Sequence, residues 1–258
     1  MPGHSTWFDF VIPHYAELVA KFRELVGVTW LNGTPVSIQY VLGLLFVALV
    51  LLFLVMIARG ALVDKEKSLV PDPKFSPRTF LESMIEGTLS TMEGVMDRKT
   101  ALYFLPLIGT CAFVIFFSNL LGLIPGFLPP SSNLSTTLAM AVVIFITTHI
   151  YGVKEHGFIG YFAHFCGPIR KWYALPLMIL MFCIELISHM ARPMSLSVRL
   201  MGNMSADHMV VAVFIGLIPI LVPVPILVLG TVVCIVQTAV FCILSIVYIG
   251  GAVAHEEH

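Results

Sequence analysis

Six polar side chains recur along one apolar stretch of this chain at a spacing that suits a single face of a helix. Counted from the first, the other five follow after 4, 7, 14, 18 and 22 residues. At about 100° per residue, these offsets keep all six within about 40° of one line along a helix. The six are Glu185, His189, Arg192, Arg199, Asn203 and Asp207. Ionisable groups inside an apolar segment face a protein interior or water, and they indicate an ion pathway.

Part of this stripe also has a purely structural interpretation. Glu185 can pair with Arg192 to hold helices together, and Arg192 can extend its guanidinium to a membrane face. Pro193 lies inside the stripe and can shift its alignment locally. For Arg199 we favour the functional interpretation over the structural one.

Arg199 can act as a fixed positive charge but not as a proton carrier, because a guanidinium keeps its proton at every accessible pH. In a low-dielectric site that charge favours the ionised form of a nearby carboxylic acid, and it repels a cation leaking straight across. Proton carriers must therefore be other groups, either titratable side chains or water held by amides. The candidates are Glu185, His189, Asp207, His208, Asn203 and Gln237.

Long apolar segments must position these groups. The chain is 58% hydrophobic and 11% charged, whereas soluble chains carry about 25% charged residues. Uncharged runs of about 20 residues or more match the ~30 Å bilayer core as helices, and no strand-like alternation is present. We expect an all-α polytopic membrane protein with about five embedded helices. The expected spans are 36–58, 101–124, 134–151, 172–217 and 226–250, in a membrane domain 36–258 that follows an N-terminal arm 1–35.

Two segments need separate interpretation. The stretch 80–99 mixes apolar and acidic residues, and we expect an amphipathic helix that lies on the membrane surface or against a partner. The stretch 172–217 would be roughly 65–70 Å long as a helix, about twice the bilayer core. It either crosses twice or forms one long, steeply tilted helix, and hydropathy alone leaves both open.

Basic residues favour the cytoplasmic side of a membrane. Among the segments that connect the expected spans, 59–78, 98–99 and 154–171 contain basic residues, whereas the loops near 125–133 and 217–226 carry no charge. This pattern predicts an N-terminus outside and a C-terminus in the cytoplasm.

Composition excludes several other classes. The net charge of −1 does not favour a nucleic-acid partner. The five cysteines form no CxxC pair, so we expect no disulfide framework, metal site or cofactor. No HExxH, GxSxG or P-loop motif is present, so we expect neither a hydrolase nor nucleotide binding by this chain itself.

One motif resembles subunit a of the F-type ATP synthases, a proton-channel stator subunit. From Pro193 to Asn203 the chain reads PMSLSVRLMGN, which is similar to the family pattern Pro-x-Ser-Leu-x-x-Arg-Leu-x-Gly-Asn. Further similar stretches are 118–125, 164–168 and 237–248, and the resemblance extends from about residue 36 to the C-terminus.

The resemblance implies a bacterial inner-membrane protein whose last two helices form a long, tilted hairpin beside a ring of c subunits. Each c subunit carries a buried carboxylate, and two offset aqueous half-channels lead to it from opposite sides. Arg199 matches the essential arginine that separates them. The other implied partners are b-type peripheral stalk subunits and the lipid bilayer. Matching channel positions are Asn203, Gln237, Glu185 and Asn119, with Ser118, His149 and Tyr248 as further candidates.

The chain departs from the family at the usual Glu–His pair. Many relatives have a glutamate where this chain has His208, and others place the acid seven residues before the glutamine, where this chain has Gly230. We expect Asp207 or Glu185 to supply the missing carboxylate, with His208 as a proton relay.

The main alternative is a secondary ion-coupled transporter. That class predicts inverted repeats and helices broken by Gly and Pro around a midplane site. No repeat relates the two halves of this chain, and it has a single charged stripe. A membrane anchor without transport function would have no charge in mid-span, which Arg199 contradicts.

Overall fold

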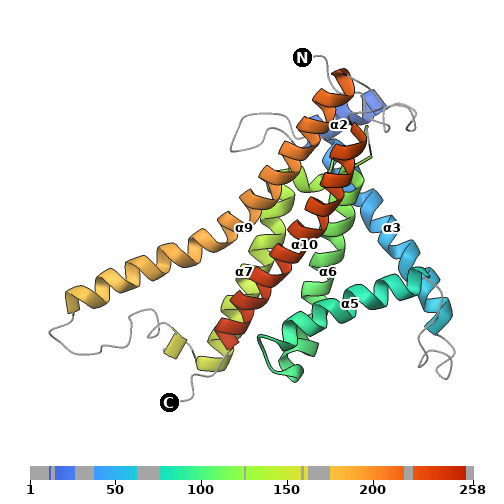
Figure 1. Cartoon of the computed structure of the whole chain (residues 1–258). Coiled ribbons are helices and arrows are strands. Elements are labelled where there is room, and N and C mark those ends of the chain that lie inside the picture. Colours follow the sequence, from blue (N-terminus) through green and yellow to red (C-terminus); the bar gives the residue numbers. More distant parts are fainter. Residues whose placement is uncertain are drawn as a thin grey trace. The chain divides into compact units, whose positions relative to one another are not determined.

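The computed structural model describes residues 12, 15–26, 38–62, 76–124, 126–157, 160–161, 175–217 and 223–253. These residues form seven α-helices and one 3-10 turn, with no strand among them (Figure 1). The predicted all-α fold is confirmed. The linker at 63–75, the motif at 164–168, the loop at 218–222 and the tail at 254–258 lie outside the described residues. So do the end of the arm at 27–35 and the first two residues of the expected first span, 36–37.

Five helices are long and apolar enough to cross a membrane. They correspond to the five predicted spans, and each begins and ends within five residues of the predicted limits. Much of their surface is apolar and exposed: only 17% of the most apolar window of the first is buried within the chain. Such a surface requires lipid or a partner around it. The five are α3 (Ile38–Leu62), α6 (Arg98–Gly122), α7 (Leu134–His156), α9 (Leu175–Leu217) and α10 (Pro223–Val253).

The end of α7 lies five residues beyond the predicted limit at Tyr151. Hydropathy falls at Lys154 and Glu155, but these exposed residues still belong to the last turn of the helix. The helix ends just before Gly157, whose φ of +73° is the left-handed conformation that terminates many helices. Backbone geometry, and not polarity, ends this helix.

The amphipathic helix α5 covers Pro77–Glu93 and not the predicted 80–99. Ser76 caps its start, because its Oγ accepts a hydrogen bond from the Thr79 amide at 3.3 Å. The predicted end at residue 99 was wrong, because a turn at 94–97 follows the helix, beginning at Gly94. The polar residues at 98–99 belong to the start of α6. The membrane-surface location of α5 stays a prediction.

Helix α9 is a single unbroken helix of 43 residues. The structure therefore selects one long helix over two crossings for this segment, and Pro193 lies inside it. At about 1.5 Å per residue its length is about 65 Å, so it fits a bilayer core of ~30 Å only when steeply tilted. In Figure 1 it runs as one continuous ribbon.

Within the predicted N-terminal arm, residues Tyr15–Val26 form the short amphipathic helix α2, with Glu17 in its first turn. The sequence left open whether this arm is helical or irregular. The boundary between the arm and the membrane domain stays a prediction.

The chain divides into two compact units, each built from segments far apart in sequence. Unit 1 contains residues 1–83, 113–133 and 202–238, and unit 2 contains residues 84–112, 134–201 and 239–258. Helices α5, α6, α9 and α10 contribute to both units. Each unit is described separately below.

In unit 1, α3 packs against the turn η1 (Pro130–Ser132). A Cβ on Gly43 would lie 3.1 Å from Cγ of Pro130, so the absent side chain permits this close approach. Ser205 on α9 donates a hydrogen bond to the backbone oxygen of Ser132 at 3.3 Å. The η1 loop thus contacts both α3 and the second part of α9.

In unit 2, four helices each contribute side chains that are at most 2% exposed. These residues are Ile108 of α6, Ile144 of α7, Leu200 of α9, and Ile246 and Ile249 of α10. They form the apolar core of the unit. Because that core immobilises α7, α9 and α10 together, polar side chains on these helices can be held in fixed positions.

Candidate functional site

Unit 1 contains a cavity of ≈ 310 Å³ between α6, α9 and α10. Its walls are mostly apolar, with Met204 and Phe214 among them. Three polar side chains face it: Asn119 from α6, and Asp207 and His208 from α9. A cavity of this size has room for several water molecules where polar partners are present.

Asn119 is 1% exposed, and its Oδ1 accepts a hydrogen bond of 2.6 Å from Oγ of Ser131. Its Nδ2 is buried and has no hydrogen-bond partner among the described residues. Oδ2 of Asp207 is also buried, and it too lacks a hydrogen-bond partner among the described residues. Buried polar atoms almost always have partners, so these two atoms favour water in the adjacent cavity.

Gly230 of α10 lines this cavity together with Asp207 and His208. A Cβ at Gly230 would lie 2.7 Å from Cδ2 of Leu123, so Leu123 occupies the space that a larger side chain would need. Of the two expected sources of the missing carboxylate, Asp207 lies in the cavity with His208, whereas Glu185 belongs to unit 2.

Arg199 is exposed on α9 and lies three residues past the centre of this 43-residue helix. That offset corresponds to about 5 Å along the axis. Its neighbour Val198 is 46% exposed, and Met194 is 49% exposed. The arginine is therefore presented on an apolar outer surface, away from the interior of the described chain.

The face of α9 that carries Arg199 has small residues on either side of it. Ser195 and Ala206 are exposed, and a Cβ on Gly202 would meet nothing within 4 Å. Ser195 lies four residues before Arg199, Gly202 three after and Ala206 seven after. This spacing places them on the same helical face as Arg199. Small residues on a membrane helix allow a second helix to approach closely.

The first part of the stripe forms a cluster in unit 2. Nε2 of His189 lies 3.2 Å from Oε1 of Glu185, and Nη2 of Arg192 lies 3.8 Å from the same oxygen. The Arg192 guanidinium also lies over the ring of Tyr248, 5.3 Å from its centroid. The pairing of Glu185 with Arg192 that the sequence allowed is therefore present.

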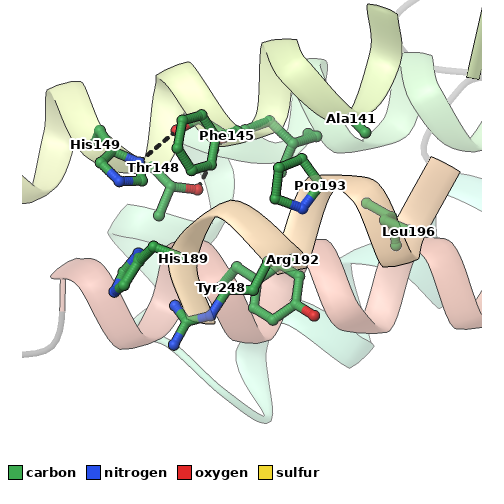
Figure 2. Close-up of a pocket in the computed structure, with 10 residues that line it drawn as sticks. Ala141, Phe145, Thr148, His149, His189, Arg192, Pro193, Leu196 and Tyr248 are labelled. Atoms are coloured by element: carbon green, nitrogen blue, oxygen red, sulfur yellow. Dashed lines mark hydrogen bonds between the residues drawn. The ribbon is translucent and has the colours of Figure 1, made fainter. Parts of the chain in front are cut away.

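Two further aromatic residues from outside α9 complete this cluster, and Figure 2 shows the first of them, His149. His149 of α7 places its ring centroid 5.3 Å from that of His189, with the planes at 80°. Tyr161 lies 5.9 Å from His149 by ring centroids, and burial raises the pKa of Tyr161 above its ordinary value. Sequence spacing did not place Tyr161 here.

The remaining candidates are half-buried: Asn203 on α9 and Gln237 on α10. Both belong to unit 1, whereas Arg199 belongs to unit 2. Of the stripe predicted from the sequence, Glu185, His189 and Arg192 form the cluster in unit 2 and Asp207 lines the cavity in unit 1, whereas Arg199 and Asn203 belong to neither. Ser131, which bonds Asn119, was missed because nothing in its loop sequence marks it.

These features define a class: an all-α, multi-pass membrane protein that holds ionisable groups at membrane-embedded positions. Comparison with known proteins identifies the family. The family described as ATP synthase A chain matches residues 41–250, and the chain belongs to this family.

Curated relatives agree with this assignment. ATP synthase subunit a of Sorangium cellulosum is 38% identical over 261 residues, covering the full length of both chains. The Geobacter sulfurreducens subunit a is 47% identical over 181 residues, 70% of this chain and 76% of its own length. ATP synthase subunit a 2 of Syntrophotalea carbinolica is 43% identical over 208 residues, 81% of this chain and 84% of its own. Membership in this family favours a membrane-sector subunit of ATP synthase over a secondary transporter.

Proposed function

We propose that this chain is the ion-translocating stator subunit of a rotary ATP synthase. It forms two offset aqueous half-channels against a ring of c subunits, and Arg199 separates the two. The guanidinium acts on the carboxylate of each passing c subunit, so that a proton leaves the ring on one side and enters on the other. The chain has no catalytic reaction of its own. It couples proton flow to rotation, and each charge crossing 100 mV supplies about 2.3 kcal/mol.

The exposure of Arg199 near the middle of α9 is the observation that carries this proposal. A charge at mid-membrane costs about 2.5–3.5 kcal/mol on insertion scales, and more in simulations of a lone helix. An arginine that faces outward from an apolar surface therefore needs a partner that supplies an opposite charge. The small residues beside Arg199 leave room for that partner to approach.

The cavity of unit 1 supports an aqueous half-channel. Asp207 and His208 can bind protons there, and Asn119 can orient water through its Nδ2, which has no hydrogen-bond partner in the described part of the chain. Asn203 and Gln237 would hold water between this cavity and the ring, in keeping with the family match. The cluster around Glu185 would belong to the opposite half-channel.

We place the chain in the inner membrane of a bacterium, with its N-terminus outside and its C-terminus in the cytoplasm. Its partners there are the c ring and b-type peripheral stalk subunits, with α5 at the membrane surface. The distribution of basic residues supports the orientation, and the bacterial relatives support the membrane.

Arg199→Ala tests the proposal in membrane vesicles that contain the whole synthase. We expect ATP synthesis driven by a proton gradient to be abolished, while the c ring still co-purifies with the chain. Ser195→Ala, one turn earlier on the same exposed face, is the matched control and should retain synthesis. Synthesis at the normal rate in Arg199→Ala would refute the proposed role.

A further inference from the structure

Two histidines from different helices lie side by side in unit 2, and the role proposed for Arg199 does not use them. The ring of His149 on α7 lies edge-to-face with that of His189 on α9, with centroids 5.3 Å apart (Figure 2). Imidazole exchanges protons near neutral pH, unlike any other unperturbed side chain. Two such groups beside Glu185 therefore have the chemistry that proton transfer requires.

The hydrogen bonding of His149 determines which nitrogen can accept a proton. Its Nδ1 lies 2.8 Å from the backbone oxygen of Phe145. A carbonyl oxygen can only accept, so Nδ1 must carry the hydrogen and donate it. In the neutral ring, Nε2 then keeps its lone pair, and this is the atom at which His149 can take up a proton.

His189 and Glu185 are close enough to exchange a proton. Nε2 of His189 lies 3.2 Å from Oε1 of Glu185, and the His189 side chain is only 12% exposed. The other charged group near this pair is Arg192, whose Nη2 lies 3.8 Å from the same carboxylate oxygen. The Glu185 and Arg192 charges offset one another, so a proton added to either imidazole gives the cluster a net charge of about +1.

The groups around the two imidazoles come from every element packed there. Glu185 and Arg192 lie on α9, Tyr248 lies on α10, and Tyr161 lies against His149. A hollow of ≈ 10 Å³ between α7, α9 and α10 is lined by both histidines. That volume is about what one water molecule requires, and the histidines and Arg192 offer it polar partners.

His149 also lies close to the end of its helix. Helix α7 ends at His156, seven residues later, which corresponds to about 10 Å along the axis. Lys154 and Glu155, in its last turn, are exposed. A proton on His149 is thus one or two helical turns from the charged boundary of the membrane domain.

We propose that Glu185, His189 and His149 form a proton-exchange chain that connects one half-channel to the surface at the C-terminal end of α7. A proton leaves the Glu185 carboxyl and bonds to the lone pair of Nε2 of His189, and the carboxylate keeps its electron pair. The proton then passes through water to Nε2 of His149 and from there to the aqueous surface. This inference rests on the proposed function, because it assigns carriers to that pathway.

Two other interpretations make different predictions. A metal site would need three suitably placed ligands, and the described residues contain no such group. A purely structural cluster would hold α7 against α9 without exchanging protons. Its loss would lower activity equally at every pH, whereas the loss of a proton carrier changes the pH dependence.

The test uses His149→Gln and His189→Gln in vesicles that contain the whole synthase. Glutamine can still donate to the Phe145 oxygen, but it cannot bind a proton near neutral pH. We expect each variant to lower the rate of ATP synthesis by about tenfold or more. The dependence of the rate on the pH at the α7 end should also differ from that of the wild type. Ile150 is the exposed neighbour of His149. Ile150→Ala should change neither the rate of ATP synthesis nor its pH dependence.

A second measurement distinguishes the loss of a proton carrier from misfolding. Added imidazole should restore synthesis in His149→Ala but not alter Ile150→Ala, because the free base can carry the proton in place of the side chain. Normal rates in both glutamine variants, or a uniform loss with an unchanged pH profile and no rescue, would overturn the inference. Arg199→Ala in the same vesicles keeps the two proposals apart: if it is inactive while the histidine variants are normal, only the proton-exchange chain is wrong.

Discussion

Arg199 and Asp207 lie two turns apart on α9 and differ in the one property that matters for moving a proton. The guanidinium is charged at every accessible pH, whereas a carboxyl can gain and lose a proton. Oδ2 of Asp207 is buried beside a cavity with no hydrogen-bond partner among the described residues. In the proposed function, Arg199 is therefore the fixed charge and Asp207 the proton acceptor.

Asp207→Asn should therefore lower proton-driven ATP synthesis. The amide has nearly the same shape but cannot bind a proton, and we expect a loss of about tenfold or more. Synthesis in inverted vesicles, normalised to the amount of assembled complex, is the measurement. Asp207→Glu keeps the carboxyl and should retain more activity. A wild-type rate in Asp207→Asn would show that Asp207 does not carry the proton.

Gly202→Ala tests the exposed face of α9 that carries Arg199. A Cβ there meets nothing within 4 Å, and Ala favours a helix over Gly by about 1 kcal/mol. We expect the chain to be slightly more stable and ATP synthesis to be slower, because the added methyl holds the ring away. Gly109 of α6 has equal space for a Cβ, so Gly109→Ala is the matched control and should not slow synthesis. Similar rates in both variants would remove Gly202 from the contact with the ring.

At the scale of elements, hydropathy predicted the spans but not where every helix stops. The five spans follow from uncharged runs, because a bilayer requires helices about 20 residues long. Gly157, in a left-handed backbone conformation, ends α7 after its last polar turn, and the turn at 94–97 separates α5 from α6. Polarity changes little at either position, so the charge pattern misplaced both ends.

The site was predictable where it lies on one helix and not where it depends on packing. Periodicity placed Glu185, His189 and Arg192 on one face of a helix, and they contact one another. The approach of His149 and Tyr161 from elsewhere in the chain depends on tertiary packing, for which the sequence contains no regular spacing. Pairing of Asn119 with Ser131 likewise depends on the conformation of the η1 loop.

Gly122→Ala should destabilise unit 1 by about 1–3 kcal/mol, a typical penalty for an overpacked contact. A Cβ at this position would lie 2.7 Å from Cβ and 2.9 Å from Cγ of Pro129. The proline ring is buried and rigid, so it cannot rotate away. Thermal unfolding in detergent should show a lower Tm. Gly87→Ala on α5, where a Cβ meets nothing within 4 Å, should leave the Tm unchanged or raise it. An unchanged Tm in Gly122→Ala would mean that the η1 loop adjusts freely.

At the scale of the whole molecule, five apolar helices present a largely apolar surface with a charged group near the middle of the longest. A chain of this kind is incomplete by itself, because lipid cannot satisfy the exposed guanidinium. Family membership identifies the complex that completes it as the membrane sector of ATP synthase. The sequence predicted this family from the motif around Arg199, but not the division of the chain into two units, which depends on long-range packing.

The most direct test is passive proton flow through the intact synthase while its rotor is held still by omission of ADP. With Arg199 present, protons cannot cross without rotation, so we predict that wild-type vesicles keep an imposed pH gradient. In Arg199→Ala vesicles the barrier between the half-channels is gone, and the gradient should collapse without ATP synthesis. Arg199→Lys, which keeps a positive charge, should hold the gradient better than the alanine variant. A gradient as stable in Arg199→Ala as in the wild type, together with normal synthesis once ADP is added, would contradict the account.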